Sequence, residues 1–135
     1  MTPPPALAAV ISTGEVERLY SGLSVLVSTA ADGAPCMALA AFRGLALLLD
    51  GDLVQHAEEP EATPALAWAG RETFARSLVE LRDTAIELES LKLYACAASV
   101  ETMALTPAQV EERLDGVMST PRFLRESAGA RLIFI

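Results

Sequence analysis

The sequence predicts one α/β domain over residues 1–135, built on an open, mainly parallel sheet of about five strands with helices on both faces. Two observations predict it. Short apolar runs of strand length alternate along the chain with amphipathic stretches of helical length. The length of 135 residues also suits a single domain with a core of its own.

The first half of the chain begins with a strand and a long helix. Residues 7–12 (LAAVIS) form a continuous apolar run, typical of a strand buried on both faces. Ser12 and Glu15 have the spacing of a capping box, so we expect a helix from there to about residue 31, with Gly33 as the stop signal. Residues 34–42 (APCMALAAF) predict a second strand and residues 43–49 a short helix. Acidic residues and prolines in residues 53–70 predict an exposed loop.

The second half repeats the alternation. Helical spacing of apolar residues from Arg71 to Leu88 predicts a long amphipathic helix, and residues 91–96 (LKLYAC) predict a strand. Residues 97–103 are expected to turn into a short helix. Helices are predicted from Thr106 to about residue 114, with Gln109 completing a capping box, and again from Thr120. Residues 115–116 predict a turn, and residues 131–135 (RLIFI) a closing strand. The arrangement resembles a flavodoxin-like three-layer domain.

The amino-acid composition and net charge favour some classes of binding partner and oppose others. The chain is 52% hydrophobic but only 5% aromatic, and its mean hydropathy is +0.36. An excess of small apolar residues favours self-association, so we expect a homo-oligomer. The net charge of −8 opposes binding to nucleic acid or to an anionic membrane surface, and no apolar run has the length of a membrane span.

The amino-terminal residues and the cysteines point to a cytoplasmic protein. Met-Thr-Pro-Pro-Pro carries no basic segment ahead of an apolar stretch, so it does not resemble a signal peptide. Cys36 and Cys96 are too few for a disulfide scaffold and are expected to be free thiols.

Cys96, at the end of a predicted inner strand, is the one residue for which the sequence predicts a chemical role. Ligands and reactive groups gather at the carboxyl ends of parallel strands. Ala97, Ala98 and Ser99 are small enough to leave the sulfur accessible and to direct backbone N–H groups at it, which lowers a thiol pKa. The competing interpretation is a cysteine that only packs, and we apply that interpretation to Cys36.

The sequence gives little support to other kinds of catalytic or ligand-binding site. His56 is the single histidine and lies among acidic residues of the predicted loop, so neither a zinc site nor a Ser-His-Asp triad is predicted. Gly14 stands alone after the first strand, where a phosphate-binding loop needs several glycines. We therefore expect no metal and no cofactor.

The stretch from Leu91 to Ile135 resembles the DsrE/DsrF-like family of small sulfur-handling proteins. In that family a strand ends in a cysteine, followed by a Met-Gly-Leu-like turn and, after a helix, by Asp-Gly-Val. The matching residues here are Cys96, Ser99, Met103-Ala104-Leu105, Asp115-Gly116-Val117, Phe123-Leu124 and the final LIFI, and the segment Glu17-Arg18-Leu19-Tyr20 is similar to the family's opening helix. The turn departs from the family at Ala104, and Ser119 and Thr120 replace glycines.

The resemblance implies a function for Cys96. In the family the matching cysteine is proposed to carry sulfur as a persulfide between protein thiols. The leading hypothesis is therefore a sulfur carrier or sulfurtransferase-like protein with donor and acceptor proteins as partners. The alternative is a non-catalytic homo-oligomeric module of the same fold, in which Cys96 only packs.

Overall fold

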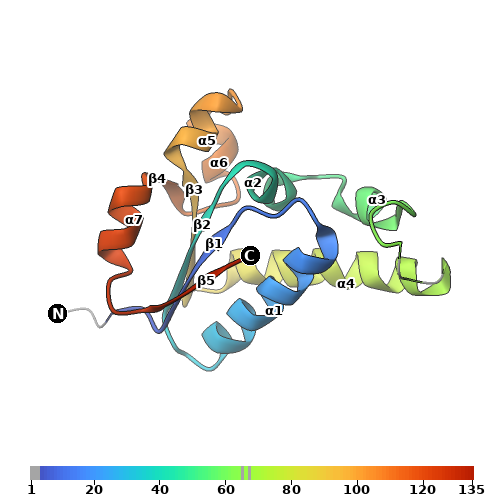
Figure 1. Cartoon of the computed structure of the whole chain (residues 1–135), viewed down its shortest axis with the longest axis horizontal. Coiled ribbons are helices and arrows are strands. Elements are labelled where there is room, and N and C mark those ends of the chain that lie inside the picture. The colour runs from blue at the N-terminus through green and yellow to red at the C-terminus, as the bar shows by residue number, and fades with distance from the viewer. Residues whose placement is uncertain (1–3, 65, 67) are drawn as a thin grey trace.

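The computed structural model describes residues 4–64, 66 and 68–135 and shows an α/β fold with an all-parallel sheet (Figure 1). The strands are β1 (Leu7–Ile11), β2 (Cys36–Ala40), β3 (Leu91–Cys96), β4 (Gly116–Met118) and β5 (Arg131–Phe134). The helices are α1 (Val16–Ala31), α2 (Phe42–Leu49), α3 (Leu53–Glu58), α4 (Trp68–Glu87), α5 (Ala97–Thr102), α6 (Pro107–Glu111) and α7 (Thr120–Glu126). The predicted fold class is confirmed.

The strand order explains how helices are distributed over the two faces. The order is β4-β3-β2-β1-β5, so the chain moves across the sheet in one direction from β1 to β4 and then returns to the far side of β1. Crossovers between parallel strands are right-handed. The first crossovers therefore share one face, and the returning crossover places α7 on the other.

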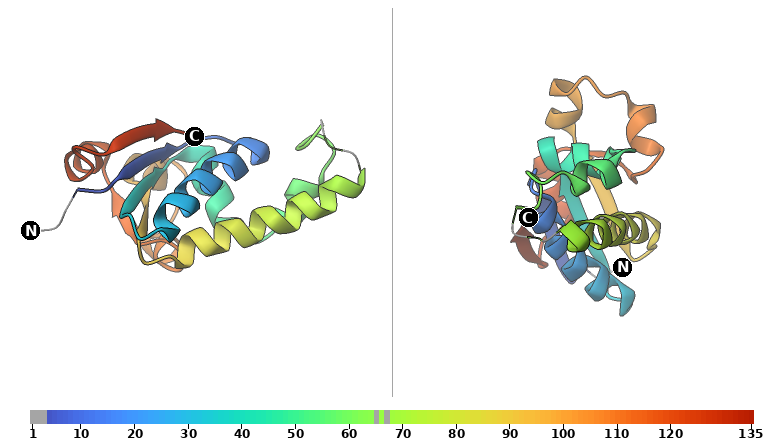
Figure 2. Two further views of the ribbon diagram at one scale, coloured as in Figure 1. Left: turned by 90° about the horizontal axis from the view of Figure 1, so that it is seen from below. Right: turned by 90° about the vertical axis from the view of Figure 1, so that its right-hand side faces the viewer.

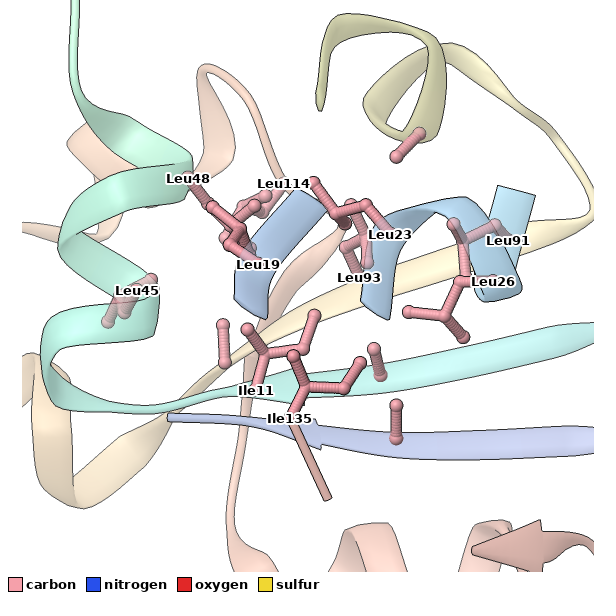
Figure 3. Close-up of a cluster of buried hydrophobic side chains, with 14 of the residues drawn as sticks. Ile11, Leu19, Leu23, Leu26, Leu45, Leu48, Leu91, Leu93, Leu114 and Ile135 are labelled. Atoms are coloured by element: carbon pink, nitrogen blue, oxygen red, sulfur yellow. The ribbon is translucent and has the colours of Figure 1, made fainter. Parts of the chain in front are cut away.

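The two hydrophobic clusters follow from this arrangement. In the larger one α1, α2 and α4 pack against one face of the sheet and α3 packs against α4. Figure 3 shows its leucines and isoleucines meeting between α1, α2 and the strands. The smaller cluster lies on the opposite face. Its members are Ala8, Met37, Leu39, Ala41, Cys96, Met118 and Phe123, and α7 supplies the only helical side chain among these buried residues. One face of the sheet is thus thickly covered and the other thinly.

The prediction of an exposed loop after α2 is wrong. The expected loop over residues 53–70 contains α3 and the start of α4, although residues 65 and 67 lie outside the described part. Leu53 and Ala57 are one helical turn apart, and both are buried in the cluster that α4 joins, so packing stabilises a helix too short to be predicted. Figure 2 shows α3 and the first turns of α4 extending beyond the sheet.

The expected turn at residues 115–116 instead leads directly into β4. This strand has three residues and pairs with the end of β3, Cys96 lying opposite Met118. Pairing with a neighbour, and not any periodicity of its own, defines so short a strand.

Helix starts were predicted with mixed success. The capping box at Thr106 and Gln109 is confirmed, and Ser119 caps α7 through the N–H of Arg122. The box at Ser12 and Glu15 is wrong. The N–H of Ser12 instead donates to the carbonyl of Ile135 beyond the end of β5, and α1 starts at Val16.

Candidate functional site

Cys96 ends β3 and is the residue immediately before α5, at the carboxyl edge of the sheet. Its side chain lies in the smaller cluster with Met118 and Phe123 and keeps 7% of its surface exposed. We expected the small residues after Cys96 to leave the sulfur accessible. Approach to the sulfur is instead narrow.

Polar groups of α5 and α7 surround the sulfur. Burial raises the pKa of the Cys96 thiol, but the amides of Ser99 and Ala98 and the hydroxyls of Ser99 and Thr120 outweigh it, so the pKa lies below its usual value. The thiol forms no cap hydrogen bond of ordinary geometry with α5. The groups therefore act as nearby dipoles that favour the thiolate. The thiolate is the nucleophilic form of a cysteine side chain.

Ser99 connects this site to the neighbouring strand. It is fully buried, and its Oγ accepts a hydrogen bond of 3.0 Å from the backbone N–H of Phe42, just after β2. Phe42 has a φ of 48°, in the left-handed region that bulky residues rarely adopt, and its side chain is 53% exposed. Strained backbone of this kind concentrates at functional sites, where the surrounding structure maintains it. The Ser99 hydroxyl is one of the contacts that maintain it here.

The predicted site residues differ in how they relate to the Cys96 sulfur. The amides of Ala98 and Ser99 are among the groups that lower the Cys96 pKa, whereas the amide of Ala97 is not. Thr120 and Phe42 were missed. Thr120 lies near Cys96 because β4 pairs with β3 so that Met118 is opposite Cys96, two residues before Thr120. Recognition of β4 as a strand would have revealed it.

Cys36 does not join the site. It begins β2, opposite Leu91 at the start of β3, and so lies at the other end of the strands from Cys96. It is 2% exposed, and burial raises the pKa of its thiol. Both cysteines are free. Cys36 is thus a buried member of the larger hydrophobic cluster at the amino end of β2.

Among the residues that the structure describes, the other titratable groups form no second site of this kind. A pocket of about 380 Å³ is lined by Cys36, Lys92, Tyr94 and Glu126, toward the amino ends of the strands, and Cys96 does not line it. His56 lies in α3 and contacts the carboxylate of Asp50, which raises the His56 pKa. Within the described residues, no group of three His, Cys, Asp or Glu side chains is placed to hold a metal ion.

None of the helices in the described part of the chain is both long and apolar enough to cross a membrane. Comparisons of the chain with protein-family models and with curated proteins gave no match. The function is therefore inferred from the residues around Cys96.

Proposed function

We propose that the protein is a sulfur carrier of the sulfurtransferase type, in which Cys96 holds sulfur as a persulfide and passes it to an acceptor thiol. One observation carries the proposal. Donors from α5 and α7 surround the Cys96 sulfur and lower its pKa in spite of burial, so the thiolate is favoured at the end of an inner strand.

The transfer needs no oxidant or cofactor. The Cys96 thiolate attacks the outer sulfur of a donor persulfide, R–S–SH, to form a new S–S bond. The old S–S bond breaks, and the donor leaves as R–S⁻ with the electron pair. Cys96 then carries –S–SH, and an acceptor thiolate repeats the exchange to release the Cys96 thiolate.

The low pKa of Cys96 serves both halves of the cycle. It raises the fraction of thiolate available for the first attack, and it makes Cys96 the better leaving group in the second, because thiols of lower pKa leave faster. Ser99 and Thr120 are positioning residues in this scheme, since they act through the charge on the sulfur. Cys36 lies at the far end of the strands, which supports an acceptor thiol from another protein.

The backbone near the site supports the resemblance to the DsrE/DsrF-like family. Ala104 stands where that family tends to have glycine, and its φ of 54° lies in the left-handed region that favours glycine. The φ of Ala104 is therefore one that a glycine at this position would adopt without strain.

The test is direct loading. The reduced full chain is incubated with a low-molecular-weight persulfide, and the intact protein and its Cys96 peptide are then weighed by mass spectrometry. We expect the mass of one sulfur atom to be added on Cys96, absent from Cys96→Ser, retained in Cys36→Ser and discharged by an added thiol. Absence of an adduct from the folded wild-type chain would refute the proposal.

A second candidate function is favoured by the burial of the sulfur. With 7% of its surface exposed, Cys96 lies in the same hydrophobic cluster as Met118 and Phe123, as a structural cysteine would. The protein would then be a non-catalytic homo-oligomeric module. Alkylation separates the two proposals, because a carrier reacts in the folded state near neutral pH, whereas a packing cysteine reacts only on unfolding.

A further inference from the structure

The free edge of β5 is the surface that the fold leaves least protected. β5 pairs with β1 on one side only, and in the part of the chain that the structure describes no strand pairs with its other side. Figure 2 shows it as the outermost strand of the sheet. Edge strands are usually blunted by proline, lysine or a bulge. The strand Arg131-Leu132-Ile133-Phe134 has no proline or lysine and one charge, at its start.

The direction of the backbone groups identifies which residues offer hydrogen bonds at this edge. The N–H groups of Arg131 and Ile135 donate to carbonyls of the β1 segment, Ala6 and Val10. Backbone groups alternate in direction along a strand, so the N–H and C=O of Leu132 and Phe134 point away from β1, toward the open side. These are unpaired donors and acceptors of the kind that another strand binds.

The same two residues carry the exposed apolar side chains. Leu132 is 40% exposed and Phe134 is 68% exposed, the highest value among the exposed large hydrophobic side chains of the described residues. Leu132 pairs with Ala8, and Phe134 with Val10, so both side chains lie on the thinly covered face of the sheet. On the other face, a hollow of about 250 Å³ between α1 and β5 is lined by Val25, which is 50% exposed.

We propose that this edge binds a second copy of the chain, β5 pairing with the partner's β5 in antiparallel orientation about a twofold axis at Ile133. Opposed residues of an antiparallel pair lie on the same face of the sheet. The register therefore places Leu132 opposite the partner's Phe134, and Phe134 opposite the partner's Leu132. Each apolar side chain covers the other, and the sheet continues across both chains.

This register also satisfies the hydrogen bonds. Leu132 and the partner's Phe134 both direct N–H and C=O outward, so each N–H meets a carbonyl of the opposing residue, and the symmetric pair does the same. Ile133 faces the partner's Ile133 between these pairs. A twofold interface requires a surface complementary to itself, and the pattern of β5 has this property.

The charged groups at the two ends of the strand are compatible with the antiparallel direction. Arg131 is exposed at the start of β5 and would lie opposite the partner's Ile135. A hollow at that end is lined by Glu15 and Arg18 together with Phe134 and Ile135. Arg131 of one copy would therefore meet charges of both signs, so this end of the interface does not add to the repulsion between two chains of net charge −8.

The test is the mass of the full chain in solution, by light scattering or sedimentation over a range of concentrations. We expect twice the 14.3 kDa of one chain. Phe134→Lys should raise the dissociation constant about 10- to 100-fold, as for the loss of a central apolar contact. Leu124→Lys is the matched control, because Leu124 is 51% exposed on α7, away from the edge, and should leave the mass unchanged. Cys96→Ser should leave it unchanged too, so failure of the sulfur-carrier proposal does not affect this one.

A crosslink checks the register. Ile133→Cys should form an intermolecular disulfide on mild oxidation, because directly opposed residues of a pair without hydrogen bonds have Cα atoms about 4.5 Å apart, within disulfide reach. Phe134→Cys should crosslink much less, since its own symmetry mate is offset by about 7–8 Å. A monomer at every concentration, an oligomer unchanged by Phe134→Lys, or preferred crosslinking through residue 134 would each overturn the proposal.

Discussion

Replacing Ser99 with alanine tests the reasoning about the site most closely. The Ser99 hydroxyl is fully buried and serves two neighbours, accepting the N–H of Phe42 at 3.0 Å and favouring the negative charge on Cys96. Ser99→Ala removes both interactions and changes little else, because alanine keeps the helix and the Cβ. We therefore expect two separate effects, one on stability and one on the Cys96 pKa.

The stability effect comes from the Phe42 amide, which loses its acceptor. A buried N–H without a partner costs about 1–3 kcal/mol, and we expect the lower part of that range, about 1–2 kcal/mol, because the Phe42 side chain beside it is half exposed. For a domain of this length that is a fall in Tm of roughly 3–8 °C.

The electrostatic effect has a defined sign. The folded pKa of Cys96 lies below the unfolded value, so ionisation stabilises the folded state above the pKa of an unfolded thiol, about 8.5. That contribution is lost as the pH falls through the folded pKa. Ser99→Ala should raise the folded pKa toward the ordinary value and so shrink this increase in stability at high pH.

The assay is the rate of alkylation of Cys96 as a function of pH, followed on its peptide by mass spectrometry, beside thermal unfolding of the same samples. Thr120→Val separates the two effects. It removes another hydroxyl near the sulfur but has no bond to Phe42, so the alkylation midpoint should rise while Tm stays nearly constant. An alkylation midpoint that is the same in wild type and Ser99→Ala would refute our account of the Cys96 pKa.

Three further predictions concern the rest of the molecule. Ala104→Gly should stabilise the fold by about 0.5–1 kcal/mol in urea unfolding, because it relieves the left-handed φ of Ala104. The control Ala108→Gly, in α6, should destabilise the fold by about 1 kcal/mol. Equal effects of the two substitutions would contradict backbone strain at Ala104. In an NMR titration, the pKa of His56 should lie above its ordinary value, and Asp50→Asn should lower it. Because the folded pKa of His56 is raised, the contact between His56 and Asp50 stabilises the fold at low pH, and this stabilisation is lost as the pH rises through the folded pKa. Arg82→Met should lower the free energy of unfolding by about 3 kcal/mol, because Arg82 is 3% exposed and its guanidinium donates to the carbonyls that end α2. A loss below about 1 kcal/mol would show that those carbonyls find other partners.

Local patterns in the sequence predicted most of the elements that bury a continuous apolar stripe. The strand that ends in Cys96 was predicted with both boundaries as observed, because five of its six residues are apolar and the small residues that begin α5 follow directly. The capping box at Thr106 is similarly local, since its two side chains bond within four residues. Cys96 became the one chemical candidate through its position at a strand end before small residues, together with the resemblance of the stretch from Leu91 to Ile135 to the DsrE/DsrF-like family.

Contacts between segments that are distant in the sequence determined the remaining features of the fold and of the site. Strand order, the short strand β4 and the helix α3 depend on neighbours that no local pattern reveals, because pairing and burial stabilise them and their own propensity does not. The surroundings of Cys96 are of this kind. Thr120 reaches the sulfur only through the pairing of β4 with β3, and Phe42 contacts Ser99 across 57 residues of sequence. The sequence alone determined that a cysteine ends a buried strand, and the tertiary structure decided which polar groups set its pKa, because electrostatic effects depend on distance in space and not along the chain.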